Sequence, residues 1–238
     1  MVILMSYIYG RGPVMEALKN NKVDKLYISA QTGSILKIIG FAKDSKVLIS
    51  NVSKDKLDKM VDGKNHQGIV ALVSGYEYKN FDKLLEETKA KKDCRLLILD
   101  KMEDPHNLGA IARSALFFNF DGIIIPKHRE ALVNDTVYKT SAGAVDHVNI
   151  CQVTNLSQTL EKLKKEEFWI YAACLDGENI KDIDFSGKIA IIIGNEGKGI
   201  SQNLIKNSDF KVKIPNLYEF DSLNASVAAG IIMYEVVR

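Results

Sequence analysis

The sequence lacks the features that would assign it to several special classes of protein. Its longest uncharged apolar runs, such as residues 189–193, are far too short to cross a bilayer, and it has no internal repeat or low-complexity segment. The apolar residues 1–5 are followed by no cleavage-type tripeptide, so we expect no signal peptide. What is left is an ordinary globular composition over 238 residues, enough for one large domain or two smaller ones.

Cysteine is scarce as well. The three cysteines, Cys94, Cys151 and Cys174, are scattered along the chain and odd in number. They have no metal-ligand spacing and imply no disulfide framework. We therefore expect no metal site and a reducing compartment, the cytoplasm.

Arginine is the third scarcity, with 5 arginines against 27 lysines. The formal net charge of +2 hides an uneven distribution, since residues 1–92 carry +6 and residues 93–238 carry −4. This asymmetry indicates that the first part of the chain meets a polyanion such as RNA. The alternative is a lysine-rich surface that is simply solvated.

The first third of the chain alternates between helical and strand patterns. We expect strands at 7–9, 26–28, 47–49 and 68–73, and helices at 14–18, 35–41 and, capped by Ser53, up to Met60. This pattern predicts a small α/β domain over residues 1–75. Residues 76–92 would form a linker and a leading helix.

The remainder reads as apolar strands separated by helices. We expect strands at 96–99, 122–125, 168–173, 189–193 and 211–214, with one helix ending near Phe118 and a last helix over 223–236. Such strands favour a mostly parallel sheet with helices on both faces, over residues 93–238. Ligands bind beyond the carboxyl ends of such strands, where three polar or glycine-rich loops lie.

The first loop, residues 100–109, leads into a helix of unusually small residues. Asp104 and Pro105 fit its N-cap and first position, and Gly109 lies among alanines that permit close approach to another backbone. Arg113 is out of place in this stretch. An arginine in so lysine-rich a chain suggests a planar fork that grips phosphate or carboxylate. The alternative is a structural arginine in an ion pair.

The second loop, residues 194–201, contains three glycines directly after a strand. It fits neither the dinucleotide-binding order of glycines nor the Walker loop, where Ser or Thr must follow Gly-Lys and Gly199 stands instead. Glu196 places a carboxylate within the loop, which would repel phosphate but tolerates a cationic or hydroxyl-bearing ligand. A tight turn without a ligand is the alternative.

The third loop, residues 214–230, leads into the last helix. Ser222 or Asn224 would cap that helix, which is a sufficient structural role for either. Together with Ser226, however, they place three hydrogen-bonding side chains at one helix start.

These residues resemble the three motifs of the SpoU (TrmH-like) RNA 2′-O-ribose methyltransferases of the SPOUT class. The motifs are Asn107 with Arg113, then Gly194-Asn195-Glu196-Gly197-x-Gly199, then Ile214-Pro215 with Ser222-Leu223-Asn224-x-Ser226. The likeness extends to Tyr9-Gly10, Val14, Glu16-Ala17-Leu18 and His66-Gln67-Gly68. It covers essentially the whole chain and looks closest to the bacterial 23S rRNA guanosine 2′-O-methyltransferases.

The resemblance implies a fold and an assembly. It implies an N-terminal RNA-binding domain like ribosomal protein L30e, and an α/β domain whose C-terminus forms a deep trefoil knot. It also implies a homodimer. The charge surplus of the first part fits the RNA-binding role.

The resemblance also implies S-adenosylmethionine as cofactor and a set of site residues. The cofactor contacts would be Gly194, Ile214 and Leu223, with Leu175, Asn195 and Gly197 nearby. The catalytic and substrate residues would be Asn107, Arg113, Glu196, Ser222, Asn224 and Ser226. A guanidinium holds its proton in proteins, so we expect Arg113 to clamp phosphate and stabilise a developing alkoxide rather than act as a base.

Three other hypotheses stay open at this point. A tRNA could be the substrate, since these motifs do not encode the RNA target. The chain could be a catalytically silent RNA-binding or ribosome-assembly protein, although such a protein has no use for Asn107, Arg113, Glu196 and Asn224 together. A nucleotide-dependent α/β enzyme is the third, and the two failed phosphate motifs weaken it.

Overall fold

The chain folds into two compact units, residues 1–77 and residues 78–238. The structure is a computed structural model that describes every residue except 1–5, 21, 30–32, 74, 129 and 217–221. Each unit has its own sheet and its own core, so each is described by itself. The α/β class expected from the sequence is confirmed in both.

Unit 1 is a four-stranded sheet in the order β1-β4-β2-β3 with three helices. Its strands are β1 (Ser6–Tyr9), β2 (Val23–Ile28), β3 (Leu48–Asn51) and β4 (Ile69–Val73). Its helices are α1 (Arg11–Lys19), α2 (Ser34–Asp44) and α3 (Lys54–Met60). Strand β4 runs antiparallel to β1 and β2, and β2 runs parallel to β3.

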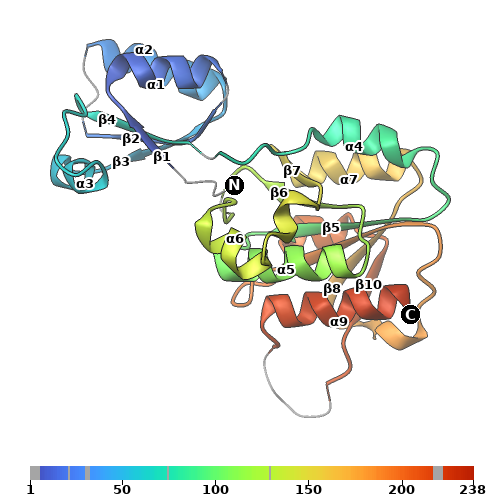
Figure 1. The fold of residues 1–238 in the computed structure, drawn as a ribbon. Coiled ribbons are helices and arrows are strands. Elements are labelled where there is room, and N and C mark those ends of the chain that lie inside the picture. The colour runs from blue at the N-terminus through green and yellow to red at the C-terminus, as the bar shows by residue number, and fades with distance from the viewer. Residues whose placement is uncertain (1–5, 21, 30–32, 74, 129, 217–221) are drawn as a thin grey trace. The chain divides into compact units, whose positions relative to one another are not determined.

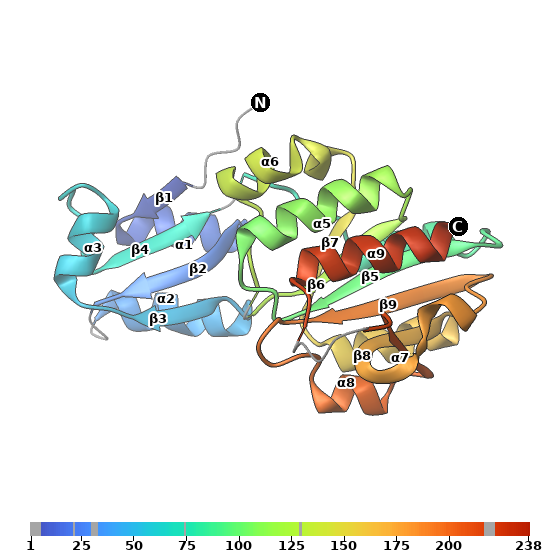
Figure 2. The ribbon, with the colours of Figure 1, turned by 90° about the horizontal axis from the view of Figure 1, so that it is seen from below.

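The alternation of side chains along these strands separates two cores of unequal size. Leu26, Ile28 and Ala71 face α1 and α2 and are fully buried among aliphatic side chains. On the other face, only the short helix α3 packs against the sheet, through Leu57 and Val70. In Figure 1, α1 and α2 lie above the strands, and Figure 2 looks onto the opposite face, with α3 at one end of it.

Unit 2 contains a six-stranded parallel sheet in the order β10-β8-β9-β5-β6-β7. The strands are β5 (Cys94–Asp100), β6 (Gly122–Pro126), β7 (Ile150–Val153), β8 (Trp169–Asn179), β9 (Lys188–Gly194) and β10 (Phe210–Lys213). The expected parallel sheet is thereby confirmed. Strands β5 and β9 are central, and their apolar residues are buried on both faces.

Helices cover both faces of this sheet (Figure 1). They are α4 (Phe81–Thr88), α5 (Pro105–Phe117), α6 (Asp135–Ser141), α7 (Leu156–Lys165), α8 (Gln202–Lys206) and α9 (Ala225–Val237). Helices α4, α7 and α8 share one core cluster with the sheet, whereas α5 and α9 pack side by side on the other face.

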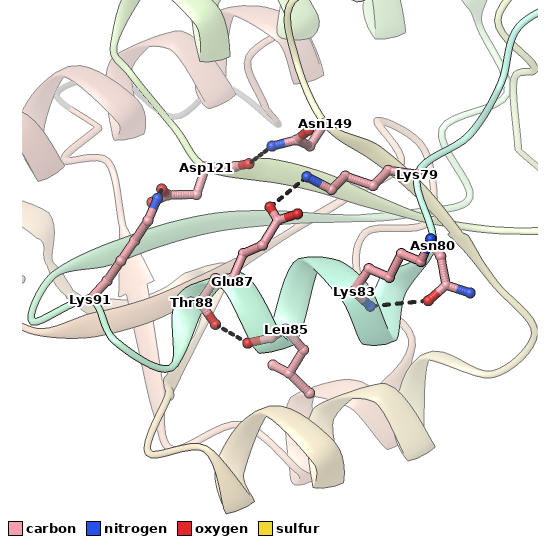
Figure 3. Close-up of polar contacts among 9 residues, drawn as sticks. All are labelled: Lys79, Asn80, Lys83, Leu85, Glu87, Thr88, Lys91, Asp121 and Asn149. Carbon is pink, nitrogen blue, oxygen red and sulfur yellow. Dashed lines mark hydrogen bonds and ion pairs between the residues drawn. The ribbon is translucent and has the colours of Figure 1, made fainter.

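Helix α4 belongs to the packing of unit 2, although the sequence pattern sets it between two domains. Asn80 caps the helix by accepting a hydrogen bond from Lys83 N at 3.1 Å, and Lys79 pairs with Glu87 within the same segment. Lys91, just beyond the helix, pairs with Asp121 (Figure 3). The buried side of α4 then completes the core over β5.

The helix caps expected at Ser53 and Asp104 are confirmed, and of the two candidates for the last helix, Ser222 and Asn224, it is Asn224 that caps α9, which begins at Ala225. Our expectations from the sequence did not include β7, α6, α7 and α8; β7, α6 and α8 are only four to seven residues long, whereas α7 has Leu156, Leu160 and Leu163 at clear helical spacing. Among the described residues, no helix is long and apolar enough to cross a membrane. Over the same residues there is no cluster of three His, Cys, Asp or Glu side chains that could hold a metal.

Candidate active site

The three polar loops converge at the carboxyl ends of β5 and β9. These two strands are direct neighbours, and their last residues, Asp100 and Gly194, are paired in register. The first loop leads from β5 into α5, and the second follows β9. The third precedes α9, which packs beside α5. Residues 217–221 of the third loop lie outside the described residues.

One carboxylate oxygen joins the three motifs. Glu196 Oε1 accepts hydrogen bonds from Asn107 Nδ2 at 2.8 Å, Asn224 Nδ2 at 2.6 Å and Ala225 N at 3.2 Å. Asn224 Nδ2 also lies 3.0 Å from Asn107 Oδ1. Residues 107, 196 and 224, far apart in the sequence, therefore form one hydrogen-bonded cluster.

Each partner in this cluster is positioned by a helix start. Asn107 lies in the first turn of α5, is only 5% exposed, and uses both atoms of its amide group. Asn224 is the N-cap of α9, where its Oδ1 accepts from the backbone of Ser226 and Val227. The carboxylate of Glu196 lies at the amino end of α9, where the helix dipole favours negative charge.

The serines of the third motif differ in their surroundings. Ser226 Oγ donates to Asn224 Oδ1 at 2.6 Å and so helps to fix the amide that contacts Glu196. Ser222 is exposed, outside this cluster. The structure thus brings Ser226 to the cluster through Asn224 and leaves Ser222 at its edge.

A second network, which we did not anticipate from the sequence, holds the loop after β9. Asp100 Oδ2 accepts from Ser201 N at 2.7 Å and from Ser201 Oγ at 2.5 Å, and Lys101 Nζ donates to the same hydroxyl at 2.7 Å. Asn195 Nδ2 donates to the Lys101 carbonyl at 3.0 Å. Lys101 itself has φ 63°, a strained value for a non-glycine residue. The sequence feature that could have indicated this network is Asp100, an acidic residue directly after the apolar residues 96–99.

The glycines of the second loop have a structural cause of their own, whatever the role of Gly194 toward a cofactor. A Cβ at Gly194 would lie 2.3 Å from Gly199 C and 2.4 Å from Ile200 N. The chain's own backbone occupies that space. Gly199 has φ 61°, which also requires glycine. In the first loop, Gly109 does allow the expected close approach, to the backbone of Val137 in α6.

The side chains expected to contact a cofactor lie at the same end of the sheet. Leu175 is 73% exposed and Leu223 is 45% exposed, both unusually high for leucine, and Ile214 is half-buried just after β10. Asn195 is fixed by its bond to Lys101, and its Oδ1 accepts from Gly197 N at 2.9 Å. These hydrogen bonds fix the conformation of the loop after β9, whose residues 196–199 are exposed.

Arg113 stands apart from this cluster. It is exposed on α5, and no described side chain forms an ion pair or hydrogen bond with it. It lies six residues beyond Asn107, so the two are separated by about 9 Å along the helix and by about 240° around it. The structure therefore does not direct Arg113 toward the Glu196 cluster of its own chain.

A further buried carboxyl lies behind the first loop. Glu130 Oε2 accepts from Met102 N at 2.9 Å, whereas Oε1 is buried with no hydrogen-bond partner among the described residues. Burial, with the nearby charge of Asp100 as a smaller contribution, raises the pKa of Glu130 to about 9. Glu130 is therefore neutral at pH 7.

Two family models together cover most of the chain. The model described as the SpoU rRNA methylase family matches residues 94–234. The model described as RNA 2′-O ribose methyltransferase substrate binding matches residues 7–79. The first match alone spans more than half of the chain, and it includes all three loops.

Individual relatives agree with these models. The chain is 41% identical over 237 residues, 98% of its length and 95% of the relative's, to YacO of Bacillus subtilis, named for the TrmH family of tRNA/rRNA methyltransferases. Among solved structures, the SpoU methyltransferase AviRb of Streptomyces viridochromogenes, in complex with AdoMet, has a similar fold. Its TM-score is 0.62 at 22% identity, over 98% of this chain and 89% of that one.

A third similarity involves a tRNA modifying enzyme. The TrmH/SpoU enzyme of A. aeolicus superposes with a TM-score of 0.56 at 27% identity, over 65% of this chain and 79% of that one. The matched family models, the full-length relative and the converging motifs have one explanation. The chain belongs to the SpoU (TrmH-like) family of RNA methyltransferases.

Proposed function

We propose that this protein transfers a methyl group from S-adenosylmethionine to a ribose 2′-hydroxyl of RNA. The observation that carries the proposal is the cluster at Glu196, where a single carboxylate oxygen joins the first, second and third motifs. A silent RNA-binding protein has no need of such an arrangement at the ligand-binding edge of a parallel sheet. Several groups that each hold the next in place are typical of a preorganised catalytic site.

The residues present fit the cofactor. Leu175 and Leu223 are large apolar side chains exposed at this edge, as suits a flat adenine, and Glu196 supplies the negative charge that a sulfonium favours. Gly194, Ile214, Asn195 and Gly197 would complete the contacts. Bound S-adenosylmethionine supplies an electrophilic methyl whose sulfur leaves as a neutral thioether.

The chain's own residues then have two tasks. One is to hold the ribose hydroxyl in line with the methyl, which we assign to Asn107, Glu196 and Asn224, with Ser226 and Ser222 beside them. The other is to stabilise the negative charge that develops on the 2′-oxygen as its proton passes to water, a charge that is lost again when the oxygen bonds to the methyl. We assign this to Arg113, whose guanidinium also grips an adjacent phosphate.

We further propose a homodimer in which Arg113 acts on the partner's site. Arg113 is exposed and turned away from its own cluster. Leu116 and Phe117, three and four positions further along the same side of α5, are 40% and 82% exposed. Neighbouring α9 exposes Val227 and Tyr234, at 50% and 52%. An apolar surface of this kind around an unpaired arginine suits a self-interface.

The finer features of the family complete the proposal. Residues 1–75 would form an RNA-binding domain like ribosomal protein L30e, in line with their positive charge and the substrate-binding match. The C-terminal segment would thread a deep trefoil knot, in line with its return from β10 to the loop after β9. A guanosine of 23S rRNA in the cytoplasm is the substrate we favour. A tRNA is the second candidate, supported by the likeness to the A. aeolicus enzyme.

Calorimetry with the full chain tests the cofactor half of this proposal. Binding of S-adenosylmethionine and its demethylated product, with no binding of NAD or ATP, is the expected result. Gly194→Ala should abolish the heat of binding, because the added Cβ would displace the backbone of Gly199. Gly40→Ala is the matched control, since a Cβ at that helical position meets nothing within 4 Å. Tight NAD or ATP binding in place of the cofactor would overturn the proposal.

A further inference from the structure

We propose that RNA bases stack on the face of the unit 1 sheet that α1 and α2 leave uncovered, with Tyr7 and Tyr27 as the stacking rings and Lys25 as a phosphate contact. We name it the tyrosine face, and it consists of Tyr7, Lys25, Tyr27, Leu48 and Leu72. The inference rests on the proposed function, because it supplies the surface through which this unit would hold a single-stranded part of the RNA substrate.

Strand register places these side chains on one face. Tyr7 of β1 pairs with Leu72 of β4, Leu72 pairs with Lys25 of β2, and Lys25 pairs with Leu48 of β3. Directly opposed residues share a face, so all four point to the same side of the sheet. Tyr27 lies two residues after Lys25 and therefore points the same way.

Coverage differs between the two ends of this face. The row through Val70 includes Tyr27, which is partly buried against Leu57 and Val70 beside α3. In the next row, Leu72 is buried at 8% exposure, but Tyr7 and Leu48 on either side are 39% and 36% exposed, and Figure 2 shows α3 at the other end of this face. On the opposite face of the same sheet, Leu26 is fully buried under α1 and α2. The tyrosine face is thus the open side of an otherwise well-packed unit.

The chemistry of the open row suits RNA. The exposed ring of Tyr7 meets the partly buried ring of Tyr27 edge to face, with centroids 6.3 Å apart, so the two rings form one continuous aromatic surface on which a base could stack. Lys25 Nζ lies 5.1 Å from the centroid of the Tyr27 ring, so a cation adjoins the aromatic surface. Burial, and then the proximity of Tyr7, raises the pKa of Tyr27, so its phenol stays uncharged and does not repel phosphate.

The combination favours single-stranded RNA over a protein partner. Aromatic rings on an open sheet, with neighbouring lysines, are how sheet-based modules hold unpaired bases, because every base has a face that can stack. Lys64 beside Tyr9, with Nζ 5.9 Å from the ring centroid, repeats the pairing at the covered end. The positive charge of residues 1–92 complements the phosphates.

Fluorescence anisotropy with the full chain tests the tyrosine face. The probes are a labelled single-stranded oligoadenylate of about twelve nucleotides and a hairpin duplex of similar length. We expect Tyr7→Leu to weaken oligoadenylate binding about tenfold, whereas Tyr7→Phe, which keeps the ring, binds like the wild type. Binding of the duplex should change little in either variant.

The chain offers a matched control for each variant. Phe41→Leu removes a ring of similar exposure, 37%, from α2 on the other side of the same unit, and should leave the affinity unchanged. Lys25→Gln should lower the slope of log affinity against log salt by about 0.7, the value for one phosphate contact on a single strand. Lys37→Gln on α2 should leave that slope as it is, and Tyr7→Leu should lower affinity without altering it.

Five results would count against some part of this account. Equal losses in Tyr7→Leu and Phe41→Leu, or no loss in Tyr7→Leu, would overturn the tyrosine face alone. A change in the molecular mass of Tyr7→Leu in solution would show that a second copy of the chain occupies the face. Preferential loss of duplex binding would overturn base stacking. A wild-type protein that binds cofactor but neither RNA would overturn the proposed function itself.

Discussion

The two surfaces that we assign to RNA, the Glu196 cluster of unit 2 and the tyrosine face of unit 1, differ in how firmly their side chains are held. In unit 2, Asn107, Glu196 and Asn224 hold one another at 2.6–3.0 Å, and Asp100 braces the loop from behind. In unit 1, the tyrosine face carries the exposed ring of Tyr7, the partly buried ring of Tyr27, and Lys25, whose ammonium group lies over the Tyr27 ring. Chemistry needs side chains fixed within a fraction of an ångström, whereas stacking on a flexible strand needs only an accessible surface.

Arg113 is the strongest test of this comparison. We assign it a catalytic role, yet its side chain is exposed like those of the tyrosine face. Arg113→Ala should lower the methylation rate by about a hundredfold or more, since a charge-stabilising donor is lost. Arg113→Lys keeps the charge without the planar fork and should remain folded and able to bind cofactor, with a large part of that loss. Single-turnover methyl transfer measures the rate, and calorimetry checks cofactor binding. Wild-type turnover by Arg113→Ala would remove it from the site.

Mixed dimers decide whether Arg113 acts on the partner's site. When inactive Arg113→Ala is exchanged with inactive Gly194→Ala, one of the two sites in a mixed dimer receives both intact halves. Activity should then return to at most about half of the wild-type value for each mixed dimer. No recovery, despite proven exchange of subunits, would show that Arg113 works within its own chain.

Removal of unit 1 separates the two kinds of surface physically. A chain that begins at Tyr78 keeps the bond from Val133 N to the Tyr78 hydroxyl and the bond from Lys79 N to the Ile150 carbonyl. It should bind S-adenosylmethionine like the full chain but lose at least about tenfold in RNA affinity, because residues 1–77 carry a net charge of +4 and the remainder carries −2. Calorimetry and anisotropy measure the two affinities. Undiminished RNA binding would contradict the division of roles.

Asp100→Asn tests whether the loop after β9 depends on its brace. The substitution keeps the shape but removes the carboxylate that accepts from Ser201 N and Ser201 Oγ. Loss of a charged hydrogen bond costs about 1.5–3 kcal/mol, so we expect weaker cofactor binding by about tenfold and a lower melting temperature. Asp93→Asn is the control, since Asp93 is exposed at the other end of β5 and bonds to Gly187 N. Equal effects of the two would refute a specific role for Asp100.

Glu130 gives a smaller effect, with a defined dependence on pH. Its pKa is raised to about 9 in the fold, so the fold favours the protonated form. Stability from this group is fully present below about pH 4.5, its unperturbed value, and is lost as the pH rises toward 9. Glu130→Gln keeps the acceptor for Met102 N and does not ionise. The variant should therefore gain stability over the wild type, by about 1 kcal/mol or more, between pH 5 and pH 9.

Denaturant unfolding at several pH values measures this difference. The free energy of unfolding of the wild type should fall relative to that of Glu130→Gln as the pH rises. Parallel curves would mean that Glu130 is ionised in the fold and that a charged partner stabilises it.

Much of the fold was readable from the sequence because the relevant signals are local. Most apolar strands, the caps at Ser53 and Asp104, and the order of strands and helices follow from neighbouring residues. Strand β7 was not among the expected strands, although β1, β3 and β10 are equally short and were expected, and helix α7 was missed although its leucines lie at helical spacing. The order of strands in the sheet depends on crossovers, which periodicity does not contain.

The candidate site was readable in its residues but not in its geometry. Resemblance identified Asn107, Glu196 and Asn224, yet only the fold brings them to one carboxylate oxygen. The brace of Asp100 on Ser201 spans 101 residues and leaves no local pattern. The packing reason for glycine at position 194 was hidden in the same way, since it depends on how the backbone of Gly199 and Ile200 folds back onto it.

Ribose methylation in cells is the measurement that tests the central claim most directly. Ribosomal and transfer RNA from cells lacking the gene would be digested and analysed by mass spectrometry for ribose-methylated nucleosides, with the wild-type gene and Arg113→Ala returned in parallel. The account predicts that one 2′-O-methylated nucleotide disappears, returns with the wild-type gene, and does not return with Arg113→Ala. An unchanged set of ribose methylations, or the loss of a base methylation instead, would contradict it.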